Sequence, residues 1–292
     1  MPTELEIRLA EFVDRDTEMS RFCGMLDSGT RSIMFVSGGG GYGKSSLLAR
    51  MIHECALRDL RKSEITWSET QNHDYLGIMR RIRDDIGVEY FQNFTTVVNQ
   101  FTDPSIRITV AANLSNIEVA HGLQMEGSTV GDVGGIIVKD NMFVVPKGDR
   151  SIPESERMIP LTVAFLQNLA AAALKIGPIA VFFDAVEKMT RETSAWVVGE
   201  LFHAVQTGTL RNIFFVHCGR EKPIVDRFVD SIAEEAELGP LKAEDIVLYL
   251  QKRGMKEANL DYAELLLVAT KGNPLQIATL IDAVMKQRQK RT

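Results

Sequence analysis

The first third of the chain alternates between helical periodicity and short apolar runs. A helix is expected over residues 5–18, and a second amphipathic helix then places Phe22 and Met25 on one face. Residues 33–36 are continuously apolar, which is typical of a buried strand, and residues 46–52 return to a helical pattern. The same reasoning predicts a strand over residues 64–67 and a buried helical stretch over residues 75–98.

The pattern changes between residues 106 and 145, where β-branched residues alternate in short runs separated by glycines and by Asp140-Asn141. Short alternating runs with tight turns predict a small β-rich insertion. Two interpretations of it stay open. One is a hairpin without a role of its own, and the other is a strand edge on which another chain docks.

Strands and helices alternate in the second half of the chain. A helix is expected over residues 153–175, an apolar strand over 178–184, a helix over 194–206 and another strand over 212–217. Strands that are apolar throughout, each followed by a helix, predict a parallel sheet covered on both faces. Beyond residue 241 the pattern is purely helical, which predicts a small lid domain.

Composition places the chain among soluble globular proteins. Of its 292 residues 45% are hydrophobic and 25% are charged, and the formal net charge is −6. That acidic balance argues against broad nucleic-acid binding and makes nucleic-acid partners an unfavoured expectation. The three cysteines lie far apart, which fits a reducing cytoplasm. No secretory leader and no membrane-spanning stretch is expected from the sequence.

Between the first strand and its helix lies a complete phosphate-binding motif, Gly-x₄-Gly-Lys-Ser. Glycines let the backbone N–H groups surround phosphates, Lys44 supplies a charge for the β- and γ-phosphates, and the Ser45 hydroxyl suits Mg²⁺. The alternative is a glycine-rich turn with a coincidental lysine. The predicted nucleotide-binding residues of this loop are Gly38, Gly39, Gly40, Gly41, Tyr42, Gly43, Lys44, Ser45 and Ser46.

Three residues after later strands complete the predicted catalytic set with Lys44. Asp184 ends an apolar strand and is predicted to bind Mg²⁺ together with Ser45. Glu187 is a candidate for polarising the attacking water, and a solvated turn glutamate is its alternative. Arg220 follows the next strand and could sense the γ-phosphate, with a surface salt bridge as the alternative.

The order of these motifs resembles the STAND branch of AAA+-type P-loop ATPases, which includes NACHT and NB-ARC modules. The segments that carry the resemblance are residues 12–16, the phosphate loop, 181–187, 215–220, 238–241 and 272–275. The resemblance implies that Val13 and Arg15 border the adenine and that Pro274 of the lid contacts the nucleotide. Two positions depart from the family pattern: Asp14 replaces a glycine, and Lys188 follows Glu187, so that slow and rapid turnover both stay open.

The expected fold is therefore α/β: a P-loop NTPase core with a parallel sheet between helices, a β-rich insertion and a C-terminal helical lid. The predicted domains are residues 1–104 and 148–238 for the core, 105–147 for the insertion and 239–292 for the lid. The expected ligands are ATP or ADP with Mg²⁺, and the expected reaction is ATP hydrolysis.

The expected role is a cytoplasmic ATP-dependent switch in signalling or defence, which assembles with protein partners or with itself and uses no membrane. Two alternatives remain open. One is a DNA-transaction ATPase resembling origin-recognition and clamp-loading proteins, which generally add a basic winged helix that is not apparent in this sequence. The other is a nucleotide-stabilised scaffold with little hydrolysis.

Overall fold

The computed structural model describes residues 9–29, 31–67, 73–102, 109–111, 131–133, 136–139, 142–144, 154–255 and 258–289. Its strands are β1 (Ile33–Gly38), β2 (Arg61–Thr66), β3 (Thr109–Ala111), β4 (Gly131–Val133), β5 (Ile136–Lys139), β6 (Met142–Val144), β7 (Ile179–Asp184), β8 (Ile213–Cys218) and β9 (Ala233–Leu238). Its α-helices are α2 (Asp16–Ser28), α3 (Lys44–Leu57), α4 (Tyr75–Ile86), α5 (Gln92–Thr102), α6 (Glu154–Ile176), α7 (Arg191–Trp196), α8 (His203–Gln206), α9 (Arg227–Ser231), α10 (Ala243–Lys252), α11 (Leu260–Thr270) and α12 (Pro274–Gln289).

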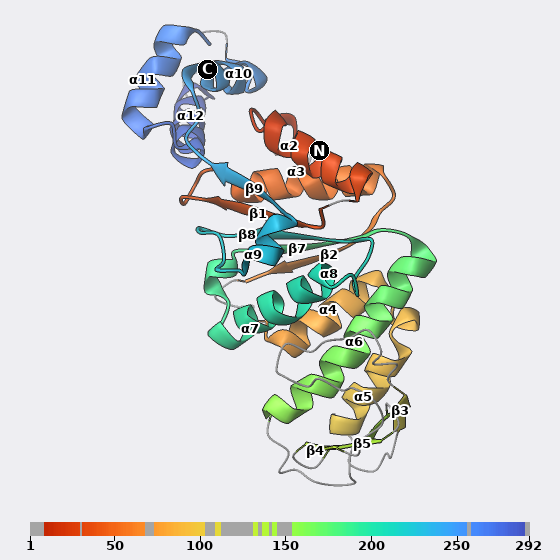
Figure 1. Cartoon of the computed structure of the whole chain (residues 1–292). Coiled ribbons are helices and arrows are strands. Elements are labelled where there is room, and N and C mark those ends of the chain that lie inside the picture. The colour runs from red at the N-terminus through yellow and green to blue at the C-terminus, as the bar shows by residue number, and fades with distance from the viewer. Residues whose placement is uncertain are drawn as a thin grey trace.

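The central sheet has five parallel strands in the order β2-β7-β8-β1-β9. Helices cover both of its faces, with α2 and α3 on one side and α4, α7 and α8 on the other (Figure 1). The α/β fold class predicted from the alternating pattern is therefore confirmed. All five strands point the same way, so their carboxyl ends meet at one edge of the sheet.

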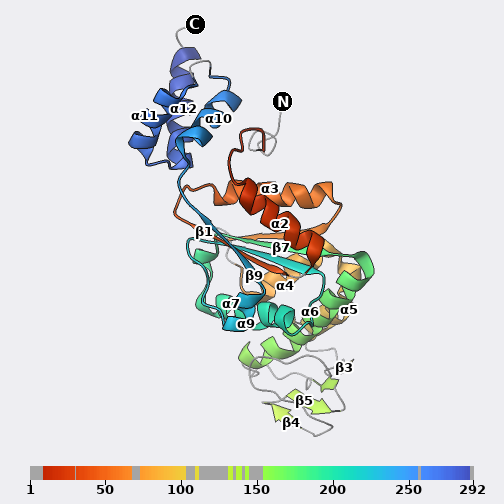
Figure 2. The ribbon, with the colours of Figure 1, turned by 45° about the horizontal axis from the view of Figure 1, so that its top comes forward.

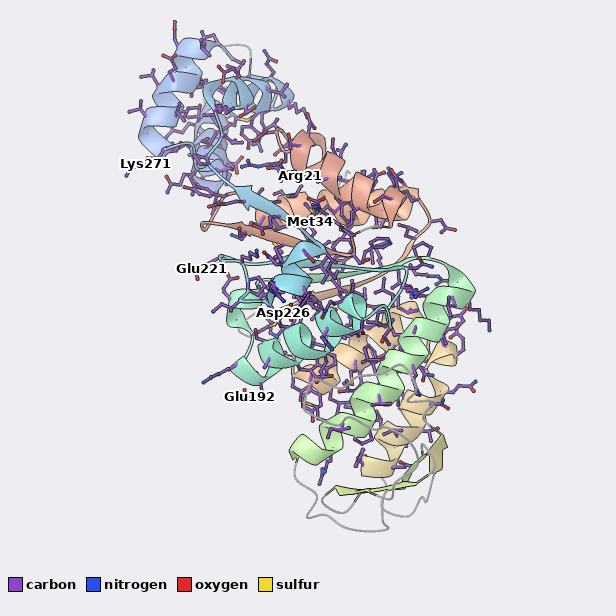
Figure 3. The ribbon with its side chains drawn as sticks, viewed as in Figure 1. Arg21, Met34, Glu192, Glu221, Asp226 and Lys271 are labelled. Atoms are coloured by element: carbon purple, nitrogen blue, oxygen red, sulfur yellow. The ribbon has the colours of Figure 1, made fainter. Side chains whose placement is uncertain are left out.

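The central strands contribute side chains to the core on both faces of the sheet, because successive side chains point to opposite faces. On β1, Met34 and Val36 pack against α2 and α3, whereas Ile33 and Phe35 pack into the cluster on the other face. Figure 3 shows Met34 beneath these two helices. The β8 strand is buried along its whole length. This burial explains why the central strands read as continuous apolar runs in the sequence.

Two helices that were expected to be continuous are broken in the structure. The N-terminal helix does not continue to Glu18, because residues 12–15 leave the helical conformation and Asp14 and Arg15 have positive φ angles of 60° and 73°. The stretch expected as helical over 75–98 is divided at Gly87, whose φ is 133°. The short η1 turn (Val88–Tyr90) and α5 follow it.

The edge strand β9 and the short helix α9 were not predicted. The sequence of β9 is Ala-Glu-Glu-Ala-Glu-Leu, in which three glutamates interrupt three apolar residues without regular alternation, so its periodicity is weak. It nevertheless pairs along its full length with β1. Arg21 donates to the Glu235 carbonyl oxygen at 2.6 Å and Arg31 pairs with Glu234 at 2.8 Å. These contacts place charges along the exposed edge, which discourages pairing with another strand.

The β-rich stretch forms a separate antiparallel sheet of order β3-β6-β5-β4. It lies beyond the ends of α5 and α6, on the side of the molecule away from the lid (Figures 1 and 2). The predicted runs 106–108 and 117–119 lie outside the described residues. The docking role of this sheet stays a prediction.

The helix α6 is the long core helix behind the sheet. Residues 157–176 are long and apolar enough to cross a membrane by composition, contrary to the expectation that no such stretch exists. In the fold this stretch is 61% buried, and Phe165 packs against Phe91 and Phe94 with ring centroids 5.7 and 5.5 Å apart. Its apolar character is accounted for by the core that it joins.

The helices α10, α11 and α12 form a compact lid with a core of its own, which includes Leu241, Ile246, Leu250, Ile277 and Ile281. The lid is joined to β9 by residues 239–242 and lies above the α2–α3 layer (Figure 2). It therefore stands next to the carboxyl edge of the sheet, where β9 ends.

Candidate functional site

The candidate site lies where β1, β7 and β8 end. The phosphate loop follows β1, Asp184 ends β7, and Arg220 follows β8. The Gly38 N–H donates to the Arg220 carbonyl oxygen at 3.2 Å, which fixes the backbone of Arg220 beside the start of the loop. Parallel strands thus bring together residues that are far apart in the sequence.

The phosphate loop depends on glycine at particular positions. Gly38 has a φ of +147°, and a Cβ there would lie 2.6 Å from the Leu238 carbonyl oxygen of β9. Gly43 has a φ of +86° and precedes the first turn of α3. Glycine accepts such angles without the steric cost that a Cβ imposes. The loop therefore presents the N-terminus of α3, which favours anions, toward the space in front of it.

Lys44 folds back over its own loop. Its Nζ donates to the carbonyl oxygens of Gly38 at 2.6 Å and Gly39 at 2.9 Å. The ammonium group is thereby held within the loop and remains close to where phosphates would bind.

Ser45 and Asp184 lie together, as expected for residues near the carboxyl ends of parallel strands in the same sheet. Ser45 Oγ donates to Asp184 Oδ2 at 3.2 Å, and Asp184 Oδ1 accepts from the Ala185 N–H at 2.9 Å. A hydroxyl and a carboxylate at this distance suit Mg²⁺, which binds one or two protein oxygens and completes its shell with water and phosphate oxygens. Within the described residues there is no cluster of three or more His, Cys, Asp or Glu side chains that would form an all-protein metal cage.

Cys218 lies at the carboxyl end of β8, beside Asp184, and no sequence pattern indicated it as a site residue. Burial raises the pKa of its thiol, and the negative charge of Asp184 raises it further. The thiol is therefore held neutral and serves as an inert neighbour of the Asp184 carboxylate.

Glu187 and Arg220 contact each other instead of the loop. Arg220 Nε lies 3.4 Å from Glu187 Oε1, and the Arg220 side chain is 69% exposed. In this conformation Arg220 forms the surface salt bridge that was its alternative interpretation. Its sensor role would require the guanidinium to leave Glu187 and turn toward the loop.

The lid contacts the phosphate loop directly. Asn273 Nδ2 donates to the Gly40 carbonyl oxygen at 2.9 Å, and the Leu275 N–H donates to the Gly41 carbonyl oxygen at 3.2 Å. A Cβ at Gly41 would lie 2.6 Å from Asn273 Oδ1 and 3.0 Å from Leu275 Cβ. Asn273 Oδ1 also accepts from the Gln276 N–H at 3.2 Å, so one side chain joins the start of α12 to the loop.

Arg15 ties the N-terminal segment to both sides of the site. Its side chain is 9% exposed, and Nη2 donates to the Gly239 carbonyl oxygen at 2.6 Å and to the Tyr42 carbonyl oxygen at 3.5 Å. Nη1 lies 3.1 Å from Asp14 Oδ2. Arg15 thus connects the phosphate loop, α2 and the linker to the lid.

A cavity of about 470 Å³ lies between the core and the lid, within the size range of small-molecule sites. Its walls include Val13, Arg15 and Pro274 together with loop residues from Gly41 to Ser46, all of which were predicted from the sequence. Gly38, Gly39, Gly40, Asp184, Glu187 and Arg220 are not among the residues that line it. The remaining lining residues, which the sequence did not indicate as site residues, are Glu11, Phe12, Leu241, Tyr249, Leu275, Ile277 and Ala278.

Only weak local patterns in the sequence could have indicated these additional lining residues. Leu275 and Asn273 fall in the lid motif that carries the family resemblance, but their contact with Gly40 and Gly41 depends on how the lid is placed. Tyr249 and Ile277 belong to amphipathic helices and read as ordinary core positions. Only the packing of the lid against residues 11–13 makes them part of the cavity.

No protein-family model and no curated protein sequence matches the chain. Among solved structures, it is similar to a Walker-type ATPase of Pyrococcus abyssi, with 15% sequence identity, a TM-score of 0.48, and coverage of 96% of this chain and 77% of that one. It is similar to AMPPCP-bound DnaA from Aquifex aeolicus, with 14% identity, a TM-score of 0.45, and coverage of 96% and 68%.

A third similar structure is a STAND protein with a tetratricopeptide repeat sensor from Pyrococcus horikoshii. The identity is 13% and the TM-score 0.44, and the match covers 91% of this chain but 29% of that protein. Similarities of this size say nothing about ligands or partners. The five-stranded parallel sheet between helices, with the phosphate loop between β1 and α3, is the arrangement of the P-loop NTPase fold.

Proposed function

We propose that this protein is an ATP-binding switch in which nucleotide held between the core and the lid sets their relative position. The observation that carries the proposal is the cavity between the two, with the phosphate loop on one side and Pro274 and Leu275 of the lid on the other. A ligand in this cavity would touch both parts at once. It would therefore favour the arrangement in which both contacts are made.

The phosphates of the nucleotide would be bound by the phosphate loop together with Asp184. Backbone N–H groups at the start of α3 and the Lys44 ammonium would neutralise the phosphates. Ser45 and Asp184 would hold Mg²⁺, which supplies charge neutralisation between the β- and γ-phosphates when it is bound. Lys44 would exchange its carbonyl partners at Gly38 and Gly39 for phosphate oxygens.

Hydrolysis would need an oriented water and a contact that responds to the γ-phosphate. Glu187 and Arg220 are the proposed candidates, and both are held in their mutual ion pair. If that pair persists with nucleotide bound, the protein would hold ATP with little turnover, as a nucleotide-stabilised scaffold would. A turnover assay alongside binding separates the two outcomes.

The test begins with titration of the purified protein with ATP and ADP, with and without Mg²⁺. We expect binding of both, with ATP binding strengthened by Mg²⁺. Asp184→Ala should weaken Mg²⁺-dependent hydrolysis more than it weakens nucleotide binding, and Asp261→Ala, which replaces an exposed aspartate in the first turn of α11, is the control. Absence of nucleotide binding by the unaltered protein contradicts the proposal, and equal losses of binding and turnover contradict the role of Asp184.

The assembly part of the proposal has its own measurement. Light scattering of the protein with ATP and with ADP should show a larger mass in the ATP state, whether the partner is a second copy or an added chain. Titration with DNA at several salt concentrations distinguishes the alternative of a DNA-transaction ATPase, because binding to phosphates weakens steeply as salt rises. If the protein binds DNA in a nucleotide-dependent and salt-sensitive way and does not assemble, the DNA-transaction ATPase is the better proposal and the switch is rejected.

A further inference from the structure

One aromatic side chain reaches the cavity from the lid. Among the described lining residues, Phe12 and Tyr42 belong to the N-terminal segment and the phosphate loop, whereas Tyr249 comes from α10. Tyr249 is 8% exposed and lines the cavity together with Val13, Leu241 and Ile277. This wall is apolar, unlike the wall that Lys44 and Ser45 form.

Tyr249 is backed by a fixed cation. The guanidinium carbon of Arg253, one turn further along α10, lies 5.9 Å from the centre of the Tyr249 ring. Arg253 Nη1 donates to the Glu11 carboxylate at 2.8 and 2.9 Å, and Nη2 donates to Asp282 of α12. The Arg253 side chain is 16% exposed, so these contacts are largely shielded from water.

The same contacts connect the two sides of the cavity. Glu11 belongs to the N-terminal segment that also supplies Val13, while Arg253 and Tyr249 belong to the lid. Lys252 Nζ, next to Arg253, donates to the Phe12 carbonyl oxygen. The end of α10 is thus bound to residues 11–12 by two cations, and Tyr249 takes its position from that attachment.

A nucleotide has a charged end and a flat aromatic end, and this cavity has one wall suited to each. With the phosphates at the loop, the base would lie in the apolar part between Val13 and the lid. We propose that Tyr249 packs against the base and is a specificity-determining binding residue, so that the base itself holds the lid on the core. This inference rests on the proposed function, because it takes the cavity to be the nucleotide site.

The experiment compares ATP with inorganic tripolyphosphate, which has the charged end but no base. Both are titrated, with Mg²⁺, into the unaltered protein and into Tyr249→Ala, Tyr249→Leu and Tyr249→Phe. We expect Tyr249→Ala and Tyr249→Leu to weaken ATP binding about tenfold, about 1.4 kcal/mol, and to leave tripolyphosphate binding within about twofold. Tyr249→Phe keeps the ring and should stay within about threefold for both ligands.

The matched control is Tyr262→Ala, a tyrosine of α11 that packs in the same lid core without lining the cavity. It should leave both affinities within about twofold. Tyr249→Leu retains apolar volume in the lid core, so its ATP and tripolyphosphate affinities decide the question if Tyr249→Ala unfolds the lid.

Equal losses for ATP and tripolyphosphate, or a Tyr249→Leu variant that binds ATP as the unaltered protein does, would overturn the inference. If the unaltered protein binds neither ligand, the proposed function itself fails, which is a separate result. If it binds tripolyphosphate and ATP equally well, the base makes no net contact and the role of Tyr249 is wrong.

Discussion

The phosphate end of the cavity comes from one continuous segment, residues 41–46, whereas the apolar end combines residues 11–13, Leu241, Tyr249 and residues 274–278. The first is a loop whose shape follows from its glycines and from the strand and helix that it joins. The second exists only because the lid is attached to the N-terminal segment. The two ends therefore depend on different kinds of interaction.

This difference suggests that the two ends can be weakened separately. Loss of a phosphate contact should reduce the affinity for every phosphate ligand without moving the lid. Loss of a lid contact should change the apolar end first and reach the phosphate end through Asn273, Leu275 and Arg15.

The largest effect is expected at Lys44. Lys44→Ala removes the charge that the loop offers to phosphates and should weaken both ATP and tripolyphosphate binding by about 100-fold or more, about 2.7 kcal/mol. Isothermal titration measures both ligands. Lys271→Ala is the control, since this lysine ends α11 at the edge of the lid (Figure 3) and is exposed. Unchanged affinity in Lys44→Ala would remove the basis for a phosphate site.

A smaller effect is expected where the lid meets the loop. Gly41→Ala would force a Cβ against Asn273 and Leu275 at a φ of +81°, so it should lower the free energy of unfolding by about 2 kcal/mol. It should also displace the lid, which limited proteolysis at residues 239–242 detects as faster cleavage.

The neighbouring glycine gives a matched control. A Cβ at Gly40 would meet no atom within 4 Å, and Gly40 has no positive φ. Gly40→Ala should therefore change the free energy of unfolding by less than about 0.5 kcal/mol. If the two variants are equally stable and equally resistant to protease, the lid does not rest on the loop in solution.

The two ion pairs of Arg253 allow its role at the apolar end to be tested. Glu11→Gln removes the charge through which Arg253 joins the lid to the N-terminal segment and should weaken ATP binding about fivefold, about 1 kcal/mol. Asp282→Asn removes the other partner of Arg253, which lies within the lid, and should leave ATP affinity within about twofold. Similar losses in both variants would show that Arg253 stabilises only the lid.

An effect of similar size is expected when the pH falls, at His217 of β8. Burial between the rings of Phe35 and Phe202 lowers the pKa of His217 to about 4. Because the unfolded chain then binds a proton that the folded chain does not, stability should fall as pH drops from about 6.5 toward 4. Between pH 7 and pH 5.5 the loss due to His217 should be about 1 kcal/mol.

Urea unfolding at both pH values measures this loss, and His217→Leu is the comparison. The variant should lose less stability between pH 7 and pH 5.5 than the unaltered protein. If both lose the same amount, groups other than His217 determine the acid response.

Features formed by one continuous segment of the chain were predictable from the sequence. The loop from Gly38 to Ser46, the apolar strands β1, β7 and β8, and the helices of the lid each follow from a local pattern of residues. Asp184 was placed beside Ser45 because parallel strands end at the same edge, and the two oxygens lie 3.2 Å apart. The family resemblance also indicated Val13, Arg15 and Pro274, which all line the cavity.

Other features were decided by tertiary contacts. The three glutamates of β9 hide its strand pattern, and it forms because β1 offers a free edge. The ion pair of Arg220 with Glu187 could not be read from the sequence, because the two residues follow different strands. The break at Asp14 and Arg15 reflects the contacts of Arg15 with Gly239 and Tyr42, which no local pattern contains.

Local patterns in the sequence were enough to predict a phosphate loop inside an α/β core with a helical lid, because these features depend on periodicity and on glycine at particular positions. The surroundings of the loop depend on long-range packing. Leu275 and Tyr249 line the cavity, and Asn273 contacts the loop, because α10 and α12 pack against residues 11–13 and 40–41. Contacts between segments more than 200 residues apart depend on the free energy of the whole fold, which no short stretch of sequence specifies.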